Sequence, residues 1–219
     1  MHSVADLTDP HPSDPAMTAA STPPIGPYRR APVQIHRPDP HAPEVAGRLI
    51  ELIATKWPPT PAEHVGSSAV AGLAGKGIID LLLPAEPADL PAVTQALVEL
   101  GFQPQLPAVF PASRPMLWGT FRHGPTGYRV HVHVVAASSP EVTALRGFRD
   151  ALRADPILRR RYAALKRAIV AGGPVDPVTF SNAKHDWIAA TLAQLGLTNG
   201  RQRRLYKDNP SFESTRRAS

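Results

Sequence analysis

Apolar residues recur with two different periods along this chain, and the change of period separates predicted helices from predicted strands. Over residues 43–56 they lie three and four positions apart, which predicts a helix whose buried face carries Val45, Leu49, Leu52 and Ile53. Two short apolar runs, 62–65 and 78–83, predict strands, and the second is expected to end at Pro84. A helix is predicted over 90–100, with Asp89 as its N-cap and Gly101 after its end.

The second half of the chain changes from strands to helices. Residues 117–123 and 128–135 read as the two strands of a hairpin. Helices are predicted from Ser139, after Asp155–Pro156, and over 177–195. With a short strand at 33–35, these elements predict an α/β (α+β) fold, in which helices flank a mixed sheet and the C-terminal half is helical.

Composition sets the domain organisation. Ten of the 26 prolines fall within the first 43 residues, so we predict a disordered Pro-rich tail over 1–31. One domain is expected over 32–197, followed by a basic tail over 198–219. The chain has no cysteine, which excludes disulfides and leaves only His, Asp and Glu as strong metal ligands.

The formal charge of +6 does not indicate a nucleic-acid-binding body, because the tail from Arg201 onward holds six basic residues and two acidic ones. Nucleic acid is therefore not an expected partner. The N-terminal residues lack the basic start and apolar run of a secretory signal, and no apolar run approaches the roughly 20 residues that span a bilayer. We expect a cytoplasmic protein without a membrane partner.

Two of the predicted strands carry polar side chains on one face. Strand alternation places Asp80 opposite the apolar face of its strand, and it turns Arg129, His131 and His133 away from the core. If the strands are neighbours, Asp80, His131 and His133 converge as a possible site for a divalent metal such as Mg, Mn or Zn. The alternative is that histidines on a half-exposed strand bind nothing.

A phosphate site is suggested by the turn before that strand. Gly66, Ser67 and Ser68 could offer backbone N–H groups and hydroxyls, and Lys76 follows closely. No Gly-Lys-Ser/Thr sequence opens a helix here, so this is not a P-loop. An ordinary turn with a solvated lysine is the structural alternative.

Two lysines of the helical half complete the candidate set. Lys166 follows Tyr162, and Lys184 follows Phe180, each by four positions on a predicted helix. They would suit a polyanionic ligand if the helices line a cleft, and would otherwise form the wet face of an amphipathic helix.

An ordered set of segments over roughly 33–195 resembles the GrpB family, whose members are similar to the nucleotidyltransferase superfamily. The segments are 63–70 (EHVGSSAV), 72–76 (GLAGK), 78–80 (IID), 131–133 (HVH), 148–153 (FRDALR), 162–166 (YAALK) and the closing Lys184. The resemblance implies an antiparallel or mixed sheet with a Gly-Ser turn that leads into an acid-bearing strand over a nucleotide site, where Asp80 is the candidate catalytic residue.

Active nucleotidyltransferases usually place two carboxylates one residue apart on that strand and a third on a neighbour, where they hold two metal ions. Here Leu82 stands at the second position, and His131 and His133 stand on the other strand. The acidic set is therefore incomplete. Members of the family also occur fused behind dephospho-CoA kinase, which implies a protein partner of that type and a role in its folding.

Three functions follow from these observations. The first is binding of a nucleotide or phosphorylated small molecule near Ser67 and Asp80, with transfer of a nucleotidyl group as its chemistry if the protein is an enzyme. The second is a non-catalytic binding or folding-assistance module. The third is a single-metal enzyme that uses the two-histidine, one-aspartate set.

Overall fold

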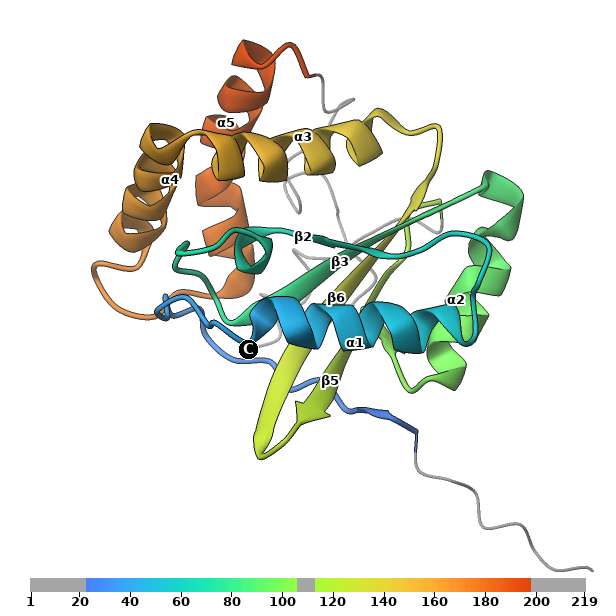
Figure 1. Ribbon diagram of the computed structural model, residues 1–219. Helices are drawn as coiled ribbons and strands as arrows, with labels where there is room; N and C mark the ends of the chain where they lie inside the picture. The colour runs from blue at the N-terminus through green and yellow to red at the C-terminus, as the bar shows by residue number, and fades with distance from the viewer. Residues whose placement is uncertain (1–22, 106–112, 198–219) are drawn as a thin grey trace, which may run out of the picture.

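The computed structural model describes residues 23–105 and 113–197, which form a six-stranded mixed sheet with helices on both sides (Figure 1). The sheet order is β1-β5-β6-β3-β2, and β4 pairs with β5. β3 and β6 are parallel, and the other pairs are antiparallel. The strands are β1 (Ile25–Gly26), β2 (Glu63–Val65), β3 (Ile78–Ala85), β4 (Gln103–Pro104), β5 (Met116–His123) and β6 (Thr126–Ala136). The predicted mixed sheet is confirmed.

Each helix has a proline in its first turn, and α3, α4 and α5 also have a capping side chain. Their bounds are α1 (Ala42–Ala54), α2 (Leu90–Glu99), α3 (Pro140–Ala154), α4 (Pro156–Ile169) and α5 (Pro177–Gln194). Ser139, Asp155 and Asp176 accept hydrogen bonds from backbone N–H groups in the first turns of α3, α4 and α5. A proline follows each of these three caps, which suits a position whose N–H has no partner within the helix.

One face of the sheet is covered by α1 and α2. Val45, Leu49 and Ile53 of α1 pack with alternate residues of β3 and β6 in one apolar cluster, which also contains Val93 and Leu97 of α2. The predicted buried faces are confirmed here. Figure 1 shows these two helices on the side opposite α3, α4 and α5.

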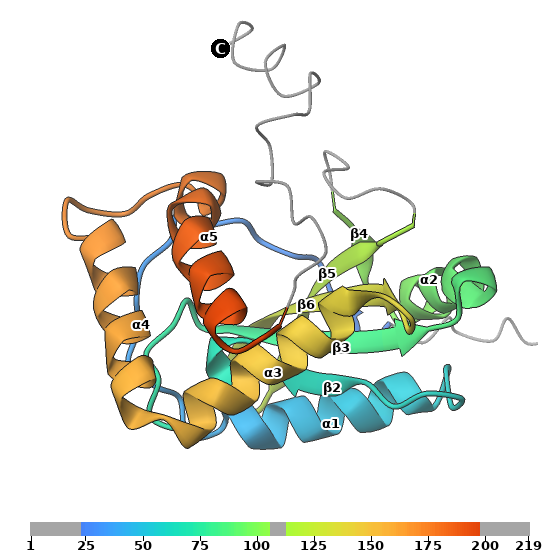
Figure 2. The same cartoon turned by 90° about the horizontal axis from the view of Figure 1, so that it is seen from above.

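The other face carries the polar side chains and is only partly covered by helices. Leu82 of β3 packs with Val65, Val135 and Val142, so α3 lies over one end of this face. Seen from above, α3 crosses the sheet while α4 and α5 stand beside it (Figure 2). The candidate residues lie on this face, between the sheet and the C-terminal helices.

Four details differ from the sequence prediction. Disorder through residue 31 is wrong, because Ile25 and Gly26 pair with β5 and Ile25 is buried. Residues 33–35 are no strand: Val33 forms an isolated bridge with Val175. β3 does not end at Pro84 but continues to Ala85. The last residue of β3 that pairs with β2 is Leu82, so the missing N–H of Pro84 leaves no hydrogen bond to β2 unmade. Asp89 makes no side-chain cap, because a 3₁₀ turn, Pro87–Asp89, precedes α2.

The basic tail over 198–219 and most of the predicted N-terminal tail lie outside the described residues. Among the helices of the described part, none is long and apolar enough to cross a bilayer.

Candidate functional site

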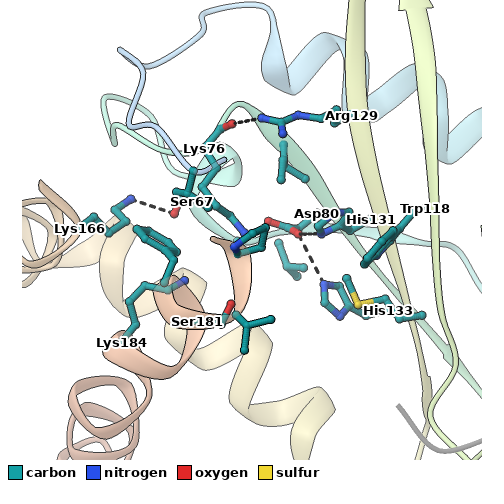
Figure 3. A pocket seen from close by; sticks show the side chains of 18 of the residues that line it. Ser67, Lys76, Asp80, Trp118, Arg129, His131, His133, Lys166, Ser181 and Lys184 are labelled. Atoms are coloured by element: carbon teal, nitrogen blue, oxygen red, sulfur yellow. Dashed lines mark hydrogen bonds and ion pairs between the residues drawn. The ribbon is translucent and has the colours of Figure 1, made fainter. Parts of the chain in front are cut away.

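A cavity of about 660 Å³ opens between the polar face of the sheet and the C-terminal helices. Most of the predicted site residues line it, namely Gly66, Ser67, Lys76, Asp80, His131, His133, Lys166 and Lys184. Figure 3 shows that Lys166 and Lys184 approach from the helices, opposite His131, His133 and Trp118. Asp80, His131 and His133 thus lie on one face of the sheet, as the alternation of their two strands predicted for neighbouring strands.

Asp80 accepts from two imidazoles on the neighbouring strand. In the parallel register Asp80 pairs with His131, and His133 lies two residues further along β6 on the same face. Asp80 Oδ1 lies 3.4 Å from His131 Nδ1 and 3.5 Å from His133 Nε2. Burial alone would raise the pKa of Asp80, but the bonds from His131 and His133 outweigh it and hold that pKa well below its usual value.

These contacts assign the His131 tautomer. An ionised carboxylate only accepts hydrogen bonds, so Nδ1 carries the proton and donates it to Asp80. His131 Nε2 then accepts from the Tyr28 hydroxyl, 2.9 Å away. Burial lowers the pKa of His131 to about 4, which keeps the ring neutral at physiological pH.

The predicted metal set does not fit this arrangement. Both nitrogens of His131 are engaged, one by Asp80 and the other by Tyr28. Leu82, at the position of a second carboxylate, is fully buried against Val142 of α3 and does not line the cavity. In residues 23–105 and 113–197, no group of three or more His, Asp or Glu side chains is placed to hold a metal ion. The chemistry of the cavity is therefore considered from its side chains alone.

The Gly66–Ser67 turn is held tightly between the sheet and α4. Gly66 has φ 72°, and a Cβ there would lie 2.6 Å from Asp80 Oδ2, so only glycine fits. The Lys166 ammonium donates to Ser67 Oγ at 2.9 Å and to the Ala74 carbonyl. The 3₁₀ helix that follows, Ser67–Ala69, has only three residues and supplies no helix dipole for a phosphate.

Ser68 was predicted to contact phosphate, but it does not line the cavity. Its hydroxyl pairs with His64 Nε2 at 3.0 Å instead. Burial, assisted by the charges of Arg153 and Arg149, lowers the pKa of His64 to about 4, although Asp80 acts in the opposite direction. Neutral His64 and Ser68 therefore form a hydrogen bond that stabilises the turn outside the cavity.

Arginines of α3 fix the same turn. Arg149 donates to Glu63 and to the His64 carbonyl, and Arg153 donates twice to the Ala69 carbonyl at 2.9–3.0 Å. Arg146 forms a further ion pair with Glu63. The FRDALR segment of the sequence thus has a structural role here.

Lys76 and Lys184 form no ion pair with a described residue, although the charge of Asp80 acts on both. Their ammonium groups lie 5.7 and 4.5 Å from the centre of the Phe180 ring, which also lines the cavity. Burial lowers the pKa of each to about 8, and the charge of Lys184 contributes to the effect at Lys76. For Lys166, burial and these two neighbouring lysines lower the pKa to about 7.

Several lining residues were not selected from the sequence. Tyr28 and Arg30 follow β1, in the segment predicted to be disordered, while Trp118 stacks on His131 with ring centres 5.4 Å apart. The signal for Trp118 was present, because it alternates with buried Leu117 along a predicted strand. Tyr28 and Arg30 carried no periodic signal, since their position depends on pairing with a distant strand.

The fold and this cavity define an α/β domain whose mixed sheet carries a polar cavity on one face. A family model described as GrpB protein matches residues 32–194. The chain belongs to the GrpB family, as the resemblance of its segments predicted.

Two relatives show how far the similarity extends. UPF0157 protein PA4798 of Pseudomonas aeruginosa is 33% identical over 170 residues, which are 74% of this chain and 67% of that protein. UPF0157 protein YqkA of Bacillus subtilis is 31% identical over 129 residues, which are 57% of this chain but only 35% of that protein. The matched part of the chain therefore spans about a third of the length of YqkA.

Two solved structures are similar to this fold. The crystal structure of conserved protein GrpB from Enterococcus faecalis aligns with TM-score 0.61 and 22% identity, over 74% of this chain and 96% of that one. Cid1 in complex with its short product ApU aligns with TM-score 0.47 and 12% identity, over 74% of this chain and 51% of that one. The alignment with the GrpB structure supports the fold alone.

Proposed function

We propose that this protein binds a phosphorylated small molecule or nucleotide, with a phosphate group between Lys76 and Lys184. The observation that carries the proposal is that both ammonium groups face one cavity without an ion pair to any described residue. Like charges held together out of water depress each other's pKa, and a dianion relieves that repulsion.

The charge of the whole cavity supports an anionic ligand. Its lining includes five cations, Arg30, Lys76, Arg129, Lys166 and Lys184. The lining holds two carboxylates, Asp80 and Asp176, whose hydrogen bonds do not cancel their charge. Five cations against two carboxylates still leave an excess of positive charge for a ligand phosphate.

The second candidate function is binding without catalysis. It is favoured by buried Leu82 and by the two engaged nitrogens of His131, which leave no acidic pair for two-metal nucleotidyl transfer. A folding-assistance role toward a kinase of the dephospho-CoA type would be one form of it, and it stays a prediction from the family resemblance.

Thermal shift and calorimetry with AMP, ATP and inorganic phosphate, each with and without Mg, Mn or Zn, test the proposal. We expect binding that needs no metal and that is weakened at least about tenfold in Lys76→Met and Lys184→Met, because each removes a charged contact. Lys56→Met is the matched control, since Lys56 pairs with Glu99 on the exposed surface. Equal affinity in all three variants would contradict a phosphate site between Lys76 and Lys184.

A further inference from the structure

Tyr28 is held in the cavity wall by the backbone around it. β1 pairs with β5 immediately before it, the Pro27 carbonyl accepts from Thr120 Oγ1 at 2.8 Å, and the Tyr28 N–H donates to Gln103 Oε1 at 3.2 Å. Its ring lies against Trp118, with centres 4.8 Å apart. The phenol hydroxyl is therefore positioned by contacts that do not involve any ligand.

That hydroxyl ends a chain of three side chains. Asp80 Oδ1 accepts from His131 Nδ1, and His131 Nε2 accepts from Tyr28 Oη at 2.9 Å. A carboxylate, an oriented neutral imidazole and a hydroxyl in this order are the arrangement by which an enzyme activates a hydroxyl nucleophile. His131 is 8% exposed, which protects the arrangement from competing water.

The surroundings of Tyr28 keep its phenol protonated in the absence of a base. Burial and the charge of Asp80 raise the pKa of Tyr28, while the charges of Arg129 and Arg30 act to lower it. Lys76 lies close enough to His131 and Asp80 to interact with both electrostatically. A phosphate held by Lys76 would thus lie next to this chain of groups.

We propose that Tyr28 is a nucleophile, with His131 as its general base and Asp80 as the residue that positions His131. Its electrophile would be a phosphorus atom of a nucleoside triphosphate, so this inference rests on the phosphate binding proposed above. Tyr28 Oη forms a bond to phosphorus as the bond to the bridging anhydride oxygen breaks. The leaving phosphate keeps that electron pair, and the phenol proton passes to His131 Nε2, where the imidazolium is paired with Asp80.

The first test measures activation without any phosphate. An aryl sulfonyl fluoride reacts with a nucleophilic phenol, releasing fluoride, and peptide mapping by mass spectrometry separates Tyr28 from the cavity lysines. We expect labelling of Tyr28 to fall about a hundredfold in His131→Gln, since Gln keeps a hydrogen bond but is no base. His41→Gln is the matched control, since His41 lies on the exposed surface beside Glu44, and it should label at the wild-type rate. Equal rates in wild type and His131→Gln overturn the activation, and Asp80→Asn provides a second variant if His131→Gln does not fold.

The second test uses ATP labelled at the α or the γ phosphorus. A covalent adduct on Tyr28, absent in Tyr28→Phe, is expected with one of the two labels, and the label that is retained shows whether a nucleotidyl or a phosphoryl group was transferred. If the protein binds ATP but no adduct forms, ATP phosphorus is not the electrophile, while the proposed phosphate binding still holds. If ATP does not bind at all, the proposed function and the electrophile both fail, while the sulfonyl fluoride rates still decide the activation.

Discussion

Gly66 lies against the carboxylate of Asp80, so closely that a Cβ on Gly66 would be 2.6 Å from Asp80 Oδ2. The contact joins the Gly-Ser turn to the acid-bearing strand, because Val65 and Asp80 are partners in the β2–β3 register. The position of the turn and the position of the carboxylate therefore depend on each other.

Gly66→Ala is expected to destabilise the protein and distort the site. Gly72→Ala is the matched control, because Gly72 has φ 73° but a Cβ added there would meet nothing within 4 Å. The control should cost about 1 kcal/mol from backbone strain alone, and Gly66→Ala at least about 2 kcal/mol more because a buried carboxylate must move. Urea unfolding measures both, and equal losses would show that the approach to Asp80 is relaxed without cost.

Lys166→Met should lower the free energy of unfolding, in contrast to Lys184→Met. Lys166 is 1% exposed, and its loss leaves Ser67 Oγ and the Ala74 carbonyl without their donor, at a cost of about 1–3 kcal/mol. Removal of the Lys184 charge relieves repulsion at Lys166, so that variant should be at least as stable as wild type. Chemical denaturation of the two variants without ligand compares them, and an equal loss in both would contradict a bracing role for Lys166.

His64 should make stability depend on pH. Its folded pKa of about 4 lies below the usual 6.5, so the unfolded chain binds the proton more readily, and stability is complete above pH 6.5 and lost as pH falls toward 4. The loss is at most about 3 kcal/mol. His64→Gln retains a partner for Ser68, and its unfolding free energy should fall less steeply between those pH values. Parallel curves for the two proteins would refute the assignment.

Phosphate affinity should decrease as pH rises from 7 to 9. The pKa values of Lys166, near 7, and of Lys76 and Lys184, near 8, mean that the cavity loses positive charge over this range. A bound dianion raises these pKa values, so the midpoint of the decrease should lie above them. Calorimetry with AMP measures it, with the double variant Lys76→Met/Lys184→Met as a control whose weaker affinity should vary less with pH. A pH-independent affinity in wild type would show that the lysines do not contact the phosphate.

The predictions that the structure confirms are those that depend on a few neighbouring residues. The helices, the hairpin and the outward face of His131 and His133 follow from periodicity and capping residues, and the structure confirms them. The end of β3 was misplaced at Pro84, because whether proline interrupts a strand depends on which side has a partner. Tyr28 was missed for a related reason: the two-residue strand before it has no pattern of its own and is defined by its distant partner.

The sequence by itself determined the family, the mixed fold and eight of the residues that face the cavity, since strand alternation and an ordered set of segments are properties of the chain. Only the tertiary structure decided what those residues do together. Asp80, His131 and His133 converge as predicted, and both imidazoles lie within 3.5 Å of the Asp80 carboxylate. The reason is that hydrogen-bond partners such as Tyr28 come from distant segments of the chain. These partners determine which atoms of a side chain remain available to a ligand.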